Sequence, residues 1–327
     1  MISHKLISLL LFFTFFALSG CSNNKIYEIN GNAFGTIYYI SIKNEKSIDL
    51  KKLKSDIDHI LNIVDNSASN YKINSEISSF NNYDGTNFKT ISSNLYNIIQ
   101  KAKIVGDKTN GFFDITLGDI KILKGFYVNK KKIKRIDTRN FSYKDITLSN
   151  GNLIKKPFGY VNIDLSGIAK GYAVDLIYNY LKTKSITSFL INIGGEIKVH
   201  SKKSDFVTLG VDDPTKQHQY IEEILINDKA IATSGTNVDT LNYEGEEISH
   251  ITNPKTLENI SNLNLLVSVI HKECTIADGL ATGLIAMNPS EIISFSNDNN
   301  IATMLTIFEN NSIEKYYSLE FMKYVKN

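Results

Sequence analysis

From residue 189 onward, the sequence is dominated by short runs of β-branched and aromatic residues that alternate with polar turns. Runs of this kind, about four to eight residues long and bounded by Gly, Asn, Asp or Ser, are typical of β-strands. We expect strands at residues 189–193, 197–200, 206–211, 220–226, 230–233 and 265–270, and at residues 36–42 near the amino terminus. This many strands in one chain indicates at least one large sheet with antiparallel pairing.

Helical patterns accompany the strands. In residues 49–64, apolar side chains recur at intervals of three and four residues, and residues 95–105 repeat the pattern. Such spacing places the apolar side chains on one face of an amphipathic helix. Residues 119–160 are rich in lysine and contain short β runs, which predicts a hairpin-bearing surface region. The expected fold class is therefore α+β, with mixed, largely antiparallel sheets and a few long helices.

The composition limits the classes of protein that remain. Apolar residues make up 42% of the 327 residues, which is enough for one large core or two modest ones and excludes a disordered chain. Lys and Arg number 36 against 34 Asp and Glu, so the formal charge of +2 gives no electrostatic reason to expect nucleic-acid binding. Two cysteines exclude a disulfide scaffold and most cysteine-based zinc sites.

The first 20 residues have the features of an export signal. A short positive region precedes an almost uninterrupted apolar stretch that is too short to span a bilayer comfortably. The stretch ends in small residues followed by Cys21, which resembles the bacterial lipoprotein box. We therefore expect residues 1–20 to be a lipoprotein signal peptide, Cys21 to carry the lipid and residues 21–30 to form a tether. The alternative is an ordinary cleaved signal, or an uncleaved anchor, with a chance cysteine.

The most informative segment, residues 162–175, has the pattern of a strand end, a tight turn and a helix. Apolar and aromatic residues recur every four positions from Ile168, so the helix should begin close to Ser166 or Gly167. Free backbone N–H groups and the positive end of the helix dipole make such a start an anion site. Lys170 lies in the first turn, where a positive side chain is unfavourable unless a negative group is bound, and we interpret it as a sign of phosphate. The alternative is a plain N-cap with a solvated lysine.

A second segment, residues 277–284, predicts a site for a hard cation. Asp278 and Thr282 are four residues apart, so on a helix they present a carboxylate and a hydroxyl on one face. Oxygen ligands of this kind suit Mg²⁺ better than Zn²⁺. The alternative is an Asp N-cap and a Thr that bonds back to its own helix.

Two further segments carry candidate residues. Asp114 lies in an aromatic run, where it could cap a turn, or accept hydrogen bonds from a heteroaromatic ring that packs against a phenylalanine. His250 follows a polar loop. A lone histidine beside a turn is more often structural, but it could also serve as a general base.

Together and in this order, these segments resemble the ApbE family of FAD:protein FMN transferases, which move FMN from FAD onto a Thr hydroxyl of a partner flavoprotein. The matching stretches are residues 34–38, 69–81, 111–118, 164–175, 190–196, 233–254 and 277–283. The resemblance covers the chain from about Phe34 to the end. It implies a T-fold-like ApbE domain over residues 31–327 that binds FAD in a cleft, with magnesium at the pyrophosphate.

Carried over motif by motif, the resemblance implies specific ligands. The metal would be held by the backbone carbonyl of Gly167 and by the side chains of Asp278 and Thr282. The expected FAD contacts are Phe34, Tyr71, Phe112, Phe113, Asp114, Asp164, Lys170 and Thr252.

The implied reaction is a phosphoryl transfer in which the acceptor Thr oxygen attacks the FMN-side phosphorus of FAD and AMP leaves. Lys170 and Mg²⁺ would stabilise the developing charge. His250 is the candidate for the base that takes the Thr proton, and Asp278 is also considered. The expected catalytic residues are therefore His250, Asp278 and Lys170.

Three departures from the family pattern affect these expectations. Residues 236–240 stand where the family usually has an acidic residue and an aromatic-rich run, so we expect this loop to contact the acceptor protein differently. Asn253 stands where the family commonly has Asp, which removes a carboxylate that could orient His250. Ala281 stands where some members have an acidic residue, which could reduce the number of metal ions held.

Two other functions stay open at this stage. A magnesium-dependent FAD pyrophosphatase would use the same cleft and pass the phosphoryl group to water. A lipid-anchored flavin-binding protein would not need the Asp278 and Thr282 pair. For the transferase, the resemblance implies an exported respiratory or electron-transfer flavoprotein as acceptor. The lipid would hold the protein on the cell membrane, facing the periplasm or the cell exterior.

Overall fold

The computed structural model describes residues 25–44, 46–127, 140–184, 186–202, 205–216, 219–237, 240–260, 264–309 and 312–326. The expected signal peptide and Cys21 lie outside these residues. No helix in the described part of the chain has the length and apolar character needed to cross a membrane.

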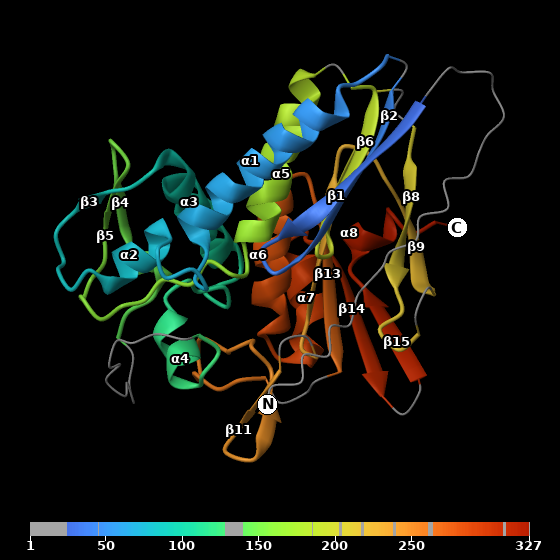
Figure 1. The fold of residues 1–327 in the computed structure, drawn as a ribbon. Coiled ribbons are helices and arrows are strands. Elements are labelled where there is room, and N and C mark those ends of the chain that lie inside the picture. The colour runs from blue at the N-terminus through green and yellow to red at the C-terminus, as the bar shows by residue number, and fades with distance from the viewer. Residues whose placement is uncertain are drawn as a thin grey trace.

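An eight-stranded sheet forms the centre of the protein (Figure 1). Each pair of neighbouring strands in it is antiparallel. In spatial order the strands are β1 (Lys25–Ala33), β2 (Thr36–Asn44), β6 (Ser188–Ile193), β7 (Glu196–Ser201), β10 (Ala230–Gly235), β13 (Leu265–His271), β14 (Ala302–Glu309) and β15 (Ser312–Tyr317). The strands that the sequence predicts in this sheet, β2, β6, β7, β10 and β13, are confirmed.

The predicted tether is wrong from residue 25 onward, because those residues form β1. Ile29 of β1 pairs with Ile40 of β2 and is 3% exposed, whereas Glu28 on the opposite face is exposed. The alternation of apolar and polar side chains is that of a strand with one buried face.

Smaller sheets surround the central one. Two predicted strands form the hairpin of β8 (Val207–Asp212) and β9 (Tyr220–Ile226). A second hairpin consists of β11 (Leu241–Tyr243) and β12 (Glu246–Ile248). A three-stranded sheet has the order β3 (Lys89–Thr90), β5 (Leu153–Lys155), β4 (Thr147–Ser149). The hairpin expected within residues 119–160 is therefore present as β4 and β5, and residues 128–139 lie outside the described part.

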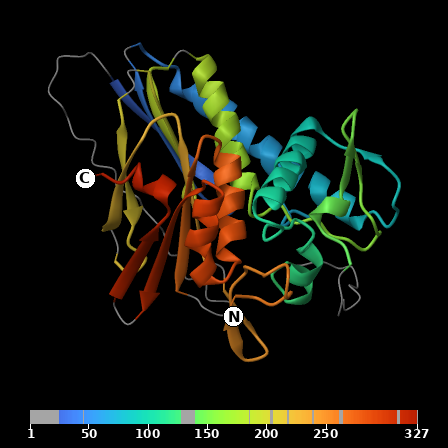
Figure 2. The ribbon, with the colours of Figure 1, turned by 180° about the vertical axis from the view of Figure 1, so that it is seen from behind.

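Helices cover one face of the central sheet. The helices are α1 (Leu50–Ala68), α2 (Glu76–Asn82), α3 (Ser93–Lys108), α4 (Gly118–Leu123), α5 (Ala169–Thr183), α6 (Cys274–Ile285), α7 (Pro289–Asp298) and α8 (Leu319–Met322), with one 3-10 turn, η1 (Tyr143–Asp145). Helices α1, α5, α6 and α7 lie on one side of the sheet, and the β8–β9 hairpin and α8 lie on the other (Figures 1 and 2). Helices α2, α3 and α4 and the three-stranded sheet form a lobe beyond α1 and α5.

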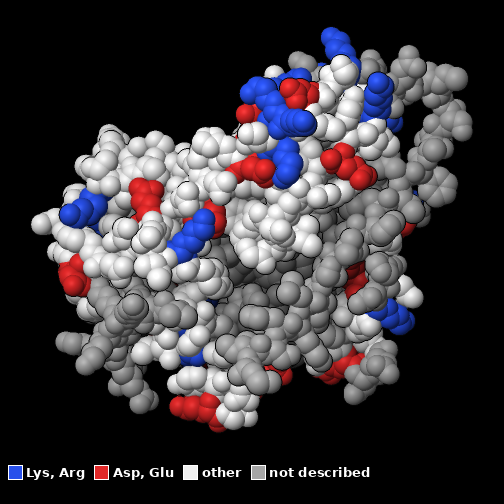
Figure 3. Space-filling view, in the orientation of Figure 1, with Lys and Arg blue, Asp and Glu red and all other residues white. Residues whose placement is uncertain are grey.

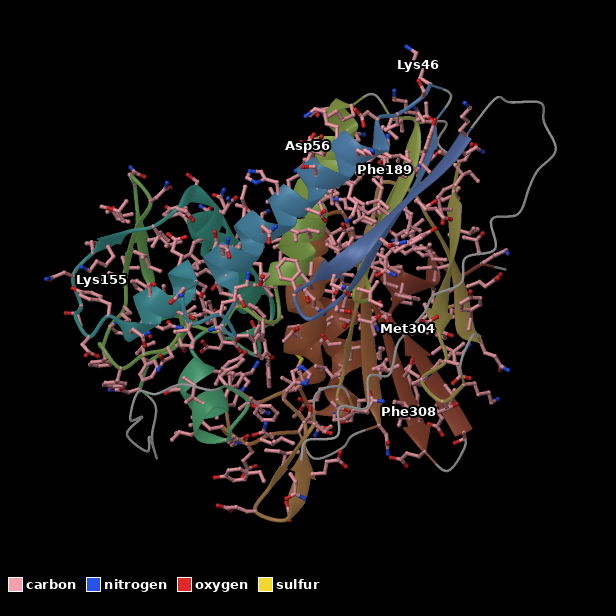
Figure 4. All side chains as sticks on the ribbon, viewed as in Figure 1. Lys46, Asp56, Lys155, Phe189, Met304 and Phe308 are labelled. Atoms are coloured by element: carbon pink, nitrogen blue, oxygen red, sulfur yellow. The ribbon has the colours of Figure 1, made fainter. Side chains whose placement is uncertain are left out.

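The two faces of the sheet bury two apolar cores. Along β10, Ala230 and Ala232 face the core on the helix side, while Ile231 between them faces the core on the β8–β9 side. Figure 4 marks one member of each core, Phe189 on β6 and Met304 on β14. Both faces of the central strands are therefore covered, which explains why their sequences are apolar in runs as well as in alternation.

The amphipathic helix predicted at residues 49–64 is α1, and the one at 95–105 lies within α3. Asp49 caps α1 by accepting a hydrogen bond from the N–H of Lys52 at 3.0 Å. The outer face of α1 carries pairs of opposite charge, including Lys54 and Asp58 at 3.0 Å. Positive and negative side chains accordingly lie side by side at the upper end of the surface in Figure 3.

Candidate active site

Helices α5 and α6 pack closely and cap each other. The residue before α5, Ile168, and the residue before α6, Glu273, make no side-chain capping hydrogen bond. Instead, Asp278 of α6 accepts a hydrogen bond from the N–H of Gly171 in α5 at 2.9 Å, and Asp175 of α5 accepts from the N–H groups of Cys274 and Thr275 at 3.0 and 2.9 Å. The unsatisfied amides at each helix start are thus satisfied by a carboxylate of the other helix.

Gly171 permits the close approach of the two helices. A Cβ at this position would lie 2.5 Å from the carbonyl oxygen of Cys274 and 2.8 Å from Cβ of Asp278. Only glycine leaves room for α6 here, so this glycine fixes the spacing of the two helix starts.

The predicted metal ligands lie together at the start of α5. The Thr282 hydroxyl donates to the carbonyl of Gly167 at 3.4 Å, and its Oγ1 is 3.2 Å from Oγ of Ser234 on β10. Asp278, one helical turn before Thr282, is 4% exposed. A Cβ on Gly167 would lie 2.9 Å from Thr282 Oγ1, so glycine keeps the space beside the hydroxyl open. A carboxylate, a hydroxyl and a backbone carbonyl make a set of hard oxygen donors, and this set fits Mg²⁺.

The helix begins later than the sequence predicts. The first residue of α5 is Ala169, not Ser166 or Gly167. Residues 166–168 form a turn instead, at whose start the N–H of Ser166 donates to the Asp164 side chain at 2.9 Å. Because of this turn, the carbonyl of Gly167 remains outside the helical ladder and can face Thr282.

Lys170 has a negative partner within the protein. Its Nζ lies 2.9 Å from Oε1 of Glu196, the first residue of β7, and the Glu196 side chain is 3% exposed. A carboxylate of the protein therefore already faces the ammonium, so the position of Lys170 in the first turn does not by itself require phosphate, and the phosphate contact stays a prediction. Glu196 is not among the predicted site residues. A charged residue that follows Gly194 and Gly195 at the start of an apolar strand is unusual, and this pattern could have marked Glu196 as a candidate.

The carboxylates in this part of the structure have perturbed acidities. Burial raises the pKa of Glu196 to about 8; Lys170 opposes the rise and Asp278 adds to it. Burial also raises the pKa of Asp278, against the effects of Lys170 and of the Gly171 N–H. Two buried carboxyl groups that share the influence of one ammonium form a site whose ionised state a cation would stabilise.

Asp164 is the centre of a second polar cluster. Its Oδ2 lies 2.6 Å from Nζ of Lys121 on α4, and its Oδ1 accepts from the hydroxyl of Tyr127 at 2.8 Å. Burial alone would raise the pKa of Asp164, but Lys121 and the hydrogen bonds outweigh it and lower the pKa below its usual value. Tyr71, which is 69% exposed, packs edge-on against Tyr127 at 5.0 Å between ring centroids. The predicted residues Tyr71 and Asp164 are therefore linked through Tyr127.

Phe34 lies at the turn between β1 and β2, where both it and Gly35 have positive φ. This turn is next to the Gly194–Gly195 turn, because the N–H of Gly194 donates to the carbonyl of Ile37 at 3.2 Å. The predicted residue Phe34 is thus near the turn that positions Glu196.

The aromatic run at residues 112–114 divides between core and surface. Phe113 is 5% exposed and belongs to the helix-side core, so the prediction that its ring stacks on a ligand is wrong in this structure. Asp114 accepts from the N–H and the hydroxyl of Thr116 at 2.8 and 2.7 Å, which is the turn-capping alternative. Phe112 is half-buried, with Nζ of Lys255 located 5.5 Å from its ring centroid.

His250 lies in a bend after the β11–β12 hairpin, and Thr252 follows it at 4% exposure. This loop is held against the end of α4, because Nζ of Lys124, the C-cap residue of that helix, donates to the carbonyl of Leu257 at 3.1 Å and also to the side chain of Asn259. Helix α4 therefore contacts both the Asp164 cluster, through Lys121, and the loop that carries His250.

Comparison with known proteins decides the family. The family model described as the ApbE family matches residues 34–305. The chain belongs to the ApbE family. An FAD:protein FMN transferase of Vibrio cholerae is 30% identical over 319 residues, which are 94% of this chain and 96% of that protein. An FAD:protein FMN transferase of Haemophilus influenzae is 27% identical over 325 residues, 94% of either chain.

The fold of the ApbE family is also confirmed. The solved structure of the flavin transferase ApbE from Vibrio cholerae matches with a TM-score of 0.78 at 28% identity, and the match covers 92% of this chain and 99% of that one. The α+β, T-fold-like architecture predicted from the sequence is therefore the observed one.

Proposed function

We propose that this chain is a magnesium-dependent FAD:protein FMN transferase that places FMN on a Thr hydroxyl of an exported flavoprotein and releases AMP. Its membership in the ApbE family makes it a flavin transferase, with FAD as substrate and a protein as acceptor. The observation that carries the finer proposal is the convergence of the Gly167 carbonyl, Asp278 and Thr282 at the start of α5.

The residues of this site have separate roles in the proposed reaction. Gly167, Asp278 and Thr282 would hold the magnesium ion, which when bound neutralises phosphate charge and acts as a Lewis acid. The ammonium of Lys170 acts electrostatically on Asp278 and would stabilise negative charge that develops on the phosphoryl oxygens. Tyr71 and Phe112 offer exposed or half-exposed ring surface for the flavin or the adenine. The remaining predicted FAD contacts are Phe34, Asp114, Asp164 and Thr252.

The test of this proposal uses the full chain in detergent with FAD, Mg²⁺ and a domain that carries the acceptor Thr of an exported flavoprotein. Intact mass should show one FMN added to the acceptor, and EDTA should abolish the addition. AMP and FMN produced without an adduct would support the pyrophosphatase instead. Bound FAD with neither product would leave a flavin-binding protein.

We propose His250 as the base that removes the proton from the acceptor hydroxyl. His250→Ala should leave the affinity for FAD nearly unchanged and lower the rate of FMN transfer about 10²- to 10⁴-fold, because general bases contribute rate factors of this size. The rate is measured by intact mass and the affinity by quenching of flavin fluorescence. His59→Ala is the control, since His59 is exposed on α1. Transfer at the wild-type rate in His250→Ala would remove His250 from the mechanism.

We also propose that the protein is anchored by a lipid on Cys21 at the cell membrane, facing the periplasm or the exterior. The support is the small-residue box before Cys21 in the sequence. Replacing Cys21 by Ser should move the protein from the membrane fraction into the soluble fraction. Equal membrane association of both forms would contradict the lipid anchor.

A further inference from the structure

Glu196 is a buried charged residue at the first position of β7, immediately after two glycines with positive φ. It is 2% exposed. A carboxylate this deeply buried is costly unless its oxygens have partners, so each of the two oxygens calls for an explanation.

The first oxygen is explained by Lys170. Oε1 of Glu196 lies 2.9 Å from Nζ of Lys170, whose side chain is 30% exposed. The ammonium therefore has the buried carboxylate as a partner, while the lysine side chain as a whole stays partly exposed. An ion pair of this kind restricts where a long, flexible lysine side chain can place its charge.

The second oxygen, Oε2, has no hydrogen-bond partner among the described residues. Asp278 is near enough to act electrostatically on Glu196. When Glu196 and Asp278 are ionised, their two negative charges outnumber the one positive charge of Lys170, which favours the binding of a cation. A magnesium ion usually retains several waters, and each water can donate a hydrogen bond.

We propose that Glu196 is a positioning residue of this site: Oε1 fixes the ammonium of Lys170, and Oε2 accepts a hydrogen bond from a water that a bound magnesium ion retains. This inference rests on the proposed function and adds to it a residue that contacts neither the flavin nor the metal directly. It explains why a carboxylate with one unpartnered oxygen is maintained in the interior.

The test replaces Glu196 by Gln, which has the same shape but no charge. The affinity for Mg²⁺, measured by calorimetry on the full chain without acceptor, should fall about 10- to 100-fold, the usual effect of losing a group that orients a metal's ligands. Glu196→Asp, which keeps the charge, should recover part of the affinity. Thr306→Val is the matched control, because Thr306 on β14 is also buried, its Oγ1 has no hydrogen-bond partner within the described part of the chain, and it is on a different strand.

A double-mutant cycle tests the link to Lys170. Glu196→Gln should lower kcat for FMN transfer about tenfold in the wild-type background and less than about twofold in a Lys170→Met background, since contacting residues are coupled. Mg²⁺ affinity within twofold of the wild type, or equal losses of kcat in the two backgrounds, overturns the proposal. If the wild type binds Mg²⁺ but transfers no FMN, the proposed function fails, while the calorimetric comparison still decides the role of Glu196.

Discussion

Asp278→Asn should abolish magnesium-dependent FMN transfer while leaving the fold intact. The asparagine has nearly the same shape, and its amide oxygen can still accept the hydrogen bond that Gly171 donates to Asp278 at 2.9 Å. It lacks the negative charge that a hard divalent cation requires from its ligands. A metal ion supplies several kcal/mol of transition-state stabilisation, and about 1.4 kcal/mol is a factor of ten, so we expect a loss of about 10²- to 10⁴-fold in transfer rate.

The measurement follows the FMN adduct by intact mass over a series of Mg²⁺ concentrations. Thr282→Ser is the control, because it keeps the hydroxyl beside the Gly167 carbonyl and should retain most of the rate. The conversion of FAD to AMP and FMN is measured in parallel without acceptor. If the protein is a pyrophosphatase, the wild type shows this conversion and Asp278→Asn loses it. Asp278→Asn with the rate and the EDTA sensitivity of the wild type would contradict the assignment of Asp278 as a metal ligand.

The strands of the central sheet were predictable where their sequences are apolar on both faces. The β-branched runs of β6, β10 and β13 lie between the two apolar cores, and this burial on both faces explains their apolar composition. Strand β1 was missed because it lies at the edge of the sheet, where only one side chain, Ile29, is fully buried and polar residues alternate with apolar ones. A short polar segment at a sheet edge has little in its sequence to distinguish it from a tether.

The candidate site was predictable where its residues are close in sequence. Asp278 and Thr282 share a face of α6 because they are four residues apart, and helical geometry alone brings them together. Glu196 was missed because its partner, Lys170, is 26 residues away on another element. Contacts of this kind depend on how β7 packs against α5, which no local spacing rule describes.

The same limit applies to Lys170 and Phe113. The first-turn lysine indicated a phosphate only as long as no internal carboxylate was known to face it. The aromatic run around Phe113 indicated a ligand surface, but a Cβ on Gly283 of α6 would lie 2.9 Å from Cβ of Phe113, which shows how closely α6 packs on this residue. In both cases the contact comes from a residue far away in the sequence, Glu196 of β7 for Lys170 and Gly283 of α6 for Phe113.

Asp175→Ala should be the most destabilising single substitution in this part of the structure. Asp175 accepts hydrogen bonds from the N–H of Cys274, and from the N–H and hydroxyl of Thr275, the hydroxyl at 2.6 Å. Its Oδ1 is also 2.6 Å from Nζ of Lys198, and the two side chains are only 11% and 7% exposed. Removing the carboxylate leaves the buried ammonium of Lys198 without its counter-charge and the first N–H groups of α6 without their acceptor, which costs about 3–5 kcal/mol. Mg²⁺ affinity should fall too, because Asp278 lies one turn from the released helix start.

The matched control is Asp213→Ala. Asp213 accepts from the N–H and hydroxyl of Thr215 at 2.7 and 2.6 Å, the same two kinds of donor, but this contact is exposed at the surface. Its loss should change the free energy of unfolding, measured with urea, by no more than about 0.5–1 kcal/mol. Adding Lys198→Met to Asp175→Ala should restore part of the stability, since the uncompensated buried charge is then removed. A loss in Asp175→Ala no larger than in Asp213→Ala would mean that the reciprocal capping of α5 and α6 contributes little, and that packing around Gly171 alone holds the metal-binding face of α6 in place.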